Sequence, residues 1–113
     1  FNIGHGEAIV MGLLPVMNRT WMLDLTKFSK IAGALGVSTG GLTEKEAAKS
    51  SIIALRELIE ETGIDLKLRD FGVHENDLDD LAGDATGYMA GCLESHPHAC
   101  SFEEVKEIYL EML

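Results

Sequence analysis

The sequence is poor in cysteine and in positive charge, and each shortage excludes a class of protein. Two cysteines, Cys92 and Cys100, are too few for a disulfide framework, so we expect a reducing, cytoplasmic environment. Lysine and arginine number 9 against 19 aspartates and glutamates, which gives a formal charge of −10. This charge would repel the phosphate backbone of a nucleic acid, so we expect no nucleic-acid partner.

Long apolar runs are also missing. No run approaches the roughly 20 residues that a membrane span needs, and the chain does not start with the charged and then apolar segments of a signal peptide. We therefore expect no membrane association. Aromatic residues make up only 6% of the 113 residues, so aliphatic side chains and methionine must fill the core of one domain or a piece of one. The methionines expected there are Met11, Met17, Met22 and Met89.

Helical signals dominate the first half of the chain. The apolar run at residues 8–17 is nearly continuous, which is typical of a helix buried on most of its circumference. Pro15 inside it predicts a kink or an early end. Apolar residues at helical spacing predict a second helix over residues 25–35, which Gly36 ends. Thr43 with Glu46 forms a capping box that opens a third helix, which runs to Gly63.

The second half continues the helical pattern. We expect a short turn at residues 66–71, an amphipathic helix over residues 77–89, and a loop at residues 92–100. Ser101 with Glu104 forms a second capping box and opens the last helix. No segment alternates with period two for long enough to form a sheet. The predicted fold is therefore all-α, a bundle-like domain of about five helices.

His5 is the first candidate for chemistry, because it lies between two glycines at the start of a predicted helix. Gly4 and Gly6 allow unusual backbone dihedrals and the close approach of a bulky group. A neutral imidazole there can serve as a metal ligand or a proton carrier. The alternative is a surface histidine in a flexible terminus. The positive end of the helix dipole disfavours a nearby cation unless carboxylates offset it, and Glu7 alone is close in sequence.

A second group of candidates lies between residues 92 and 100, where Cys92, His96, His98 and Cys100 could suggest a Cys₂His₂ zinc site. Their spacing contains no C-x₂-C pair, and Pro97 separates the two histidines, so an ordinary polar loop is the alternative. The carboxylates between Glu75 and Asp84 lack the glycine and the register of a calcium loop and are expected to form a solvated helix face.

Several short motifs occur in an order that resembles one enzyme family. They read HGEA, LLP, VMN, KIAGALGV, ELIEETGI, LRDFGV and HPHACSFEEVKEIY. Over essentially its whole length the chain resembles the C-terminal part of the helical domain of the iron-containing (group III) alcohol dehydrogenases. The strongest piece is the HG pair followed by an apolar helix with Leu14, Pro15 and Asn18.

The resemblance implies a two-domain enzyme that reversibly oxidises an alcohol to an aldehyde or ketone. In that family an N-terminal α/β domain binds NAD(P), and the helical domain holds a divalent metal, Fe²⁺ or Zn²⁺, through one aspartate and three histidines. The last of these histidines lies in the HG motif, and its role carries over to His5. The other ligands lie upstream, so residues 1–113 are expected to be a fragment that is inactive alone.

The chain departs from the family pattern at two places. Gly4 stands where proline commonly precedes the histidine, and His96-Pro97-His98 stands where the family has N-P-R. HGEA also occurs in the dehydroquinate synthase and glycerol-phosphate dehydrogenase branches, whereas the tail after Leu68 favours the alcohol dehydrogenases. The alternative function is a stand-alone helical interaction module without activity. Apolar surface around Ile3 and the first helix predicts a homo-oligomer.

Overall fold

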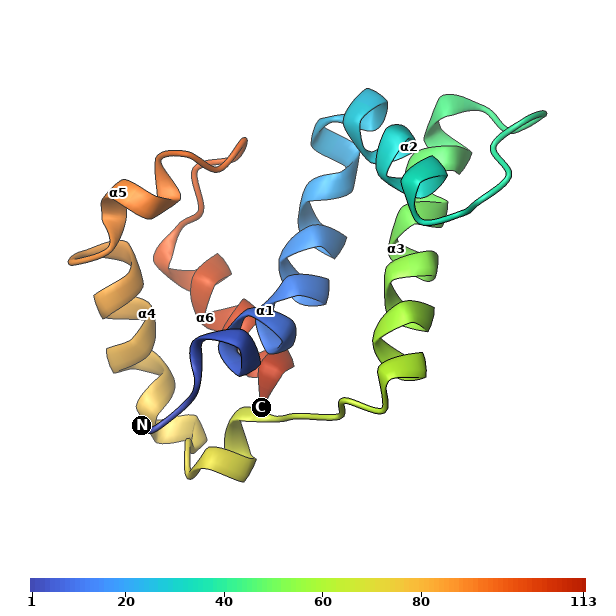
Figure 1. Ribbon diagram of the computed structural model, residues 1–113. Coiled ribbons are helices and arrows are strands. Elements are labelled where there is room, and N and C mark those ends of the chain that lie inside the picture. Colours follow the sequence, from blue (N-terminus) through green and yellow to red (C-terminus); the bar gives the residue numbers. More distant parts are fainter. The chain divides into compact units, whose positions relative to one another are not determined.

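The computed structural model describes residues 1–113 and contains helices and no strand (Figure 1). Its elements are α1 (His5–Thr20), η1 (Trp21–Leu23), α2 (Leu25–Ala34), α3 (Glu44–Thr62), η2 (Leu68–Phe71), η3 (Glu75–Asp77), α4 (Leu78–Thr86), α5 (Ala90–Leu93) and α6 (Phe102–Met112), where η denotes a 3₁₀ helix. The predicted all-α class is confirmed. The α-helices number six instead of about five, because a single turn, α5, forms where we expected only loop.

Side-chain caps start the helices as the sequence predicts. The Glu46 carboxylate accepts a hydrogen bond from the Thr43 backbone N–H at 2.8 Å, and the Glu46 N–H donates to the Thr43 hydroxyl at 3.2 Å. Ser101 and Glu104 repeat this reciprocal pair at α6 with the same two distances. Each pair satisfies backbone groups that have no partner inside the helix.

Gly63 ends α3 as expected, and its backbone shows why glycine is needed. Its φ of 71° lies in the left-handed region, and its N–H donates to the Glu60 carbonyl. A side chain would strain that conformation, whereas glycine adopts it freely.

The chain packs as two compact units: Phe1–Pro15 with Leu66–Leu113, and Val16–Asp65. In the first unit α4 packs against α6, and the start of α1 joins them. Its core consists of Met11, Leu68, Val73, Leu78 and Met112. The C-terminal end is also tied down, because the Arg69 side chain donates a hydrogen bond to the Leu113 carbonyl.

In the second unit α2 packs against α3 (Figure 1). Phe28 and Ala32 of α2 are buried, and α3 buries Ala47, Ala48, Ser51, Ile52 and Leu55. Ser51 is fully buried, yet its hydroxyl donates to the Ala48 carbonyl at 2.6 Å. This bond removes the cost of burying a polar group without a partner.

The structure corrects three expectations for the first apolar run and the methionines. The helix α1 does not end early at Pro15 but continues to Thr20. The run at residues 8–17 is buried less completely than expected: Met11 is buried, Ala8 and Ile9 are exposed, and the other positions are partly buried. Met22 and Met89 do not fill the core, since 62% and 46% of their surfaces are exposed.

The predicted helix over residues 77–89 is shorter than expected. The helix α4 ends at Thr86, and Gly87 follows with a φ of −98° and a ψ of −83°, which is not helical. The Met89 N–H donates to the Asp84 carbonyl across this break, before α5 begins at Ala90. None of the helices combines the length and apolar character that a membrane crossing would require.

Candidate metal centre

His5 is the first residue of α1, and its side chain is exposed. The Ala8 N–H donates to the Gly4 carbonyl at 3.0 Å, which makes Gly4 the residue that caps the helix. The Glu7 carboxylate reaches back and accepts a hydrogen bond from the Gly4 N–H at 2.8 Å. The imidazole itself has no hydrogen bond or ion pair with another residue of the chain, so its ring nitrogens remain available to a ligand from outside.

The glycines beside His5 leave space instead of providing unusual dihedrals. Neither Gly4 nor Gly6 has a positive φ, so the first of our two explanations for them is wrong. A Cβ atom at Gly6 would meet nothing within 4 Å, whereas one at Gly4 would lie 2.8 Å from the Glu7 Oε2. The absence of a side chain at position 4 therefore lets the Glu7 carboxylate lie close to the backbone.

The chain contains no complete metal site. No group of three or more histidine, cysteine, aspartate or glutamate side chains is arranged to hold a metal ion. His5 suits the role of a single ligand, because a neutral imidazole is a common ligand for Fe and Zn ions and this one is exposed. Glu7 supplies negative charge at the positive end of the α1 dipole, where a cation would otherwise be disfavoured.

The structure does not assemble the Cys₂His₂ set considered between residues 92 and 100. The Cys100 Sγ lies 3.8 Å from the His96 Nδ1, but the His98 Nε2 lies 2.9 Å from the Glu104 Oε1. Cys92 is exposed in α5, and the four side chains do not converge on one point. The structure therefore favours the polar loop over the zinc site, and the segment leads into the cap of α6.

Glu104 shows the strongest electrostatic effect in that segment. The Ser101 backbone N–H lowers the pKa of this carboxyl most, and the His98 ring and the Ser101 hydroxyl add to the effect, which brings the pKa to about 2. These groups stabilise the ionised form by hydrogen bonding to it. Glu104 therefore acts as a structural anion at the start of α6.

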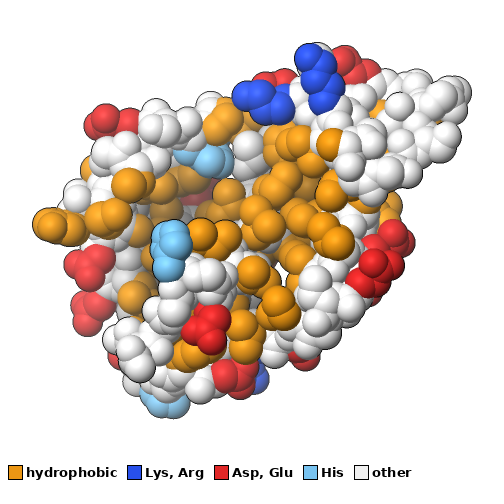
Figure 2. Space-filling model, in the orientation of Figure 1, with side chains coloured by type: hydrophobic (Ala, Val, Ile, Leu, Met, Phe, Trp, Pro, Cys, Tyr) orange, Lys and Arg blue, Asp and Glu red, His pale blue; other side chains and the backbone are white.

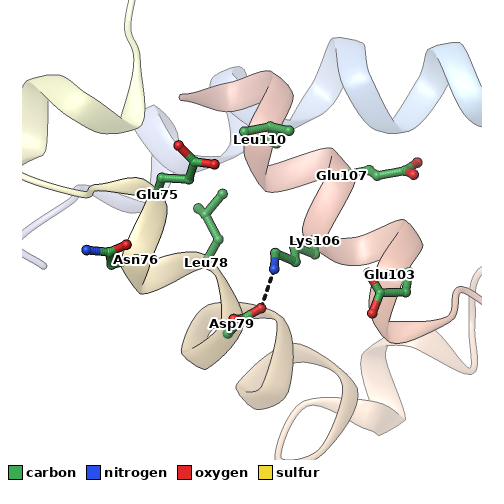
Figure 3. A pocket seen from close by; sticks show the side chains of 8 residues that line it. All are labelled: Glu75, Asn76, Leu78, Asp79, Glu103, Lys106, Glu107 and Leu110. Atoms are coloured by element: carbon green, nitrogen blue, oxygen red, sulfur yellow. Dashed lines mark ion pairs between the residues drawn. The ribbon is translucent and has the colours of Figure 1, made fainter.

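A surface groove lies between η3, the start of α4 and one side of α6 (Figure 3). Four carboxylates line it, namely Glu75, Asp79, Glu103 and Glu107, and Lys106 lies among them. The Lys106 Nζ pairs with the Asp79 carboxylate at 2.6 Å, which raises the lysine pKa. The groove contains no histidine or cysteine, and the predicted reading of this acidic region as a solvated helix face agrees with the exposure of Asp79 and Asp80.

Glu7 is close to His5 in sequence, but its part in capping α1 was not predicted. The signal was present, because Glu7 is the third helical residue, the position that glutamate takes in a capping box. Gly4 hid it, since a capping box is recognised by a serine or threonine at the preceding position, as in Thr43-x-x-Glu46.

Comparison with known proteins identifies the family. The model of the Fe-containing alcohol dehydrogenase family, C-terminal part, matches residues 1–113. Lactaldehyde reductase of Escherichia coli K12 is 30% identical over 109 residues, and 1,3-propanediol dehydrogenase of Citrobacter freundii is 32% identical over 109 residues. In both cases the match covers 96% of this chain and 28% of the relative, so the chain spans under a third of those proteins.

Solved structures agree with the sequence relatives. The crystal structure of a 1,3-propanediol oxidoreductase matches all of this chain and 29% of its own with a TM-score of 0.90 at 29% identity. An archaeal halo-thermophilic alcohol dehydrogenase from a Red Sea brine pool matches 99% of this chain and 29% of its own with a TM-score of 0.87, also at 29% identity. The chain belongs to the iron-containing alcohol dehydrogenase family and corresponds to its C-terminal helical part.

Proposed function

We propose that residues 1–113 form the C-terminal helical part of a longer, metal-dependent NAD(P)-linked alcohol dehydrogenase, in which His5 is one ligand of the metal. The family match over the whole chain is the observation that carries this proposal. The coverage of 28% of the relatives supports the view that an N-terminal dinucleotide-binding domain belongs to the same enzyme.

The proposed reaction is the reversible oxidation of a small alcohol to an aldehyde or ketone. Relatives include an NAD-dependent methanol dehydrogenase of Bacillus methanolicus and an NADPH-dependent butanol dehydrogenase of Clostridium saccharobutylicum, so both nicotinamide cofactors occur among similar proteins. An Fe²⁺ or Zn²⁺ ion held at such a site supplies Lewis-acid chemistry, and the nicotinamide supplies redox chemistry.

This chain's own contribution is the position of one imidazole. His5 projects from the first turn of α1, and Met11, six residues further along, is buried in the core of the same unit. The packed part of α1 thus continues directly into the turn that carries the exposed histidine. The open space beside Gly6 leaves room for a ligand next to the ring.

Substitution of His5 in the complete enzyme tests the proposal. We expect H5A to lose most of its bound metal and most of its alcohol-dependent reduction of NAD(P)⁺, measured by elemental analysis and by absorbance of the reduced cofactor. H74A is the matched control, because His74 is also exposed but lies in the loop before η3. We expect it to retain metal and turnover.

Full metal content and turnover in H5A would contradict the role of His5. A complete protein that binds neither metal nor nucleotide would instead support the helical interaction module. We further expect the isolated 113-residue chain to show no turnover with NAD(P)H and an aldehyde, because it supplies one ligand and lacks the other three. We also propose a cytoplasmic enzyme, because two cysteines are too few for a disulfide framework.

A further inference from the structure

The cap of α1 differs from the capping boxes that open α3 and α6. At α3 the Thr43–Glu46 pair makes two reciprocal hydrogen bonds, so loss of one leaves the other. At α1 the Glu7 Oε2 accepts from the Gly4 N–H at 2.8 Å, but Gly4 has no side chain that could return a bond to the Glu7 N–H. Glu7 therefore carries the side-chain part of this cap alone.

The one-sided cap matters because the residue that it holds is His5. The first turn of a helix frays when its end groups lack partners. His5 is the first residue of that turn and follows a glycine, which is the most flexible residue in a chain. Its imidazole makes no hydrogen bond of its own with the rest of the chain. The direction of the ring therefore depends on the backbone that the Gly4–Glu7 bond restrains.

The geometry at position 4 suits this bond. A Cβ atom there would lie 2.8 Å from the Glu7 Oε2 and would displace the carboxylate. The φ of Gly4 is not positive, so a proline is compatible with the sign of this angle. Proline would also restrain the backbone through its ring, and it has no N–H that needs an acceptor. The backbone at position 4 can therefore be restrained in two ways. Glycine is restrained by donating its N–H to the Glu7 carboxylate, whereas proline is restrained by its own ring and needs no acceptor.

We propose that Glu7 is a positioning residue for His5. Its carboxylate restrains the Gly4–His5 backbone, and its negative charge offsets the positive end of the α1 dipole beside the cation. The ring of His5 is then held in one direction before the metal binds. This inference rests on the proposed function, in which His5 is a metal ligand.

A double-mutant cycle in the complete enzyme tests it. The variants are E7A, G4P and the double variant G4P/E7A, and the readout is the affinity for Zn²⁺ and Co²⁺, measured by competition with a coloured chelator. We expect E7A to bind each metal about 10-fold more weakly, the lower end of the range for residues that orient a ligand. In the G4P background we expect the same substitution to weaken metal binding by less than about a third of that 10-fold factor. The reason is that proline already restrains the backbone.

The Co²⁺ absorption spectrum gives a second readout that a purely structural role would not change. We expect the ligand-field bands of E7A to broaden or shift and those of G4P/E7A to return toward those of G4P. E7Q keeps an acceptor oxygen without the charge, so its loss of affinity should lie between the wild type and E7A. Wild-type affinity and spectrum in E7A, or an equal loss from E7A in both backgrounds, would overturn the inference.

E46A is the matched control, because it removes the corresponding hydrogen bond, also 2.8 Å long, from the cap of α3. We expect E46A to lower the melting temperature but to leave metal affinity unchanged. An equal loss of affinity in E46A would show a general effect of stability and would overturn the inference. Failure of the proposed function looks different: H5A would then bind metal as tightly as the wild type. If H5A loses metal while E7A binds as the wild type does, only the role of Glu7 is wrong.

Discussion

Hydrogen bonds around a single carboxylate change its chemistry at the start of α6. The Glu104 carboxyl has a pKa of about 2 instead of its ordinary 4.5, chiefly through the Ser101 N–H and then through His98 and the Ser101 hydroxyl. Because the pKa is lowered in the folded state, the ionised carboxylate stabilises the fold above about pH 4.5. This contribution is lost as the pH falls through about 2.

The pH dependence of unfolding should show this effect. We expect the free energy of unfolding to fall less steeply between pH 4.5 and 2 in E104Q than in the wild type, measured by urea unfolding at each pH. E61Q, which changes an exposed glutamate near the end of α3, is the control and should keep the wild-type slope. An unchanged slope in E104Q would contradict the expected role. Salt should reduce the difference, because Glu104 is exposed to solvent on one side.

The roles of single residues in the candidate site could be predicted from the sequence only in part. The choice of His5 came from the sequence and its resemblance, and the structure shows an exposed imidazole without partners in the chain. The part of Glu7 in the cap of α1 was missed because it depends on where a flexible carboxylate lies. Conversely, Cys92 and Cys100 are close in sequence but do not join the two histidines in one site, since the turn α5 holds Cys92.

At the scale of elements, we expect replacement of glycine by alanine to have opposite effects on stability at two positions. Gly63 ends α3 with a φ of 71°, which a side chain adopts only with strain. Gly33 lies inside α2, where an added Cβ would meet nothing within 4 Å. We expect G63A to destabilise the protein by about 1 kcal/mol and G33A to stabilise it by about 0.5–1 kcal/mol.

Thermal and urea unfolding of the two variants measures these changes. The same substitution is made in both, so the difference in sign isolates the backbone conformation from the effect of the added methyl group. If both variants destabilise the protein equally, the left-handed conformation at Gly63 does not account for the cost.

Local signals predicted most helix boundaries. Both capping boxes and the Gly63 end were confirmed, because each involves groups within four residues of one another. The predicted turn at residues 66–71 appears as η2. The break at Gly87 was not predicted, since apolar spacing continues across it to Met89. The persistence of α1 through Pro15 was also open, because a proline removes one backbone bond but packing decides whether the helix continues.

At the scale of the whole molecule, net charge and exposed apolar surface have opposite effects on self-association. The chain carries a formal charge of −10, yet large apolar side chains remain exposed, among them Phe1 at 65%, Met22 at 62% and Tyr88 at 91%. Figure 2 shows that apolar side chains and carboxylates both reach the surface. Apolar surface of this kind favours association, whereas like charge disfavours it.

We therefore propose that the chain forms homo-oligomers and that salt strengthens their formation. Sedimentation velocity of the 113-residue chain at low and at 0.5 M salt tests this, since salt shortens the Debye length from about 30 Å at 0.01 M toward 3 Å at 1 M. We expect the mean mass to rise with salt and protein concentration. A monomer under all of these conditions would contradict the proposed association.

The sequence by itself determined the all-α class, the caps of α3 and α6 and the family, because these depend on local hydrogen bonds, helical periodicity and the order of short motifs. The tertiary structure decided which apolar residues are buried. Met11 and Met112 lie in a core while Met22 and Met89 lie on the surface, although helical spacing favoured burial for Met89 as well. Burial depends on which helices meet, and contacts between residues far apart in the chain leave little trace in local sequence patterns.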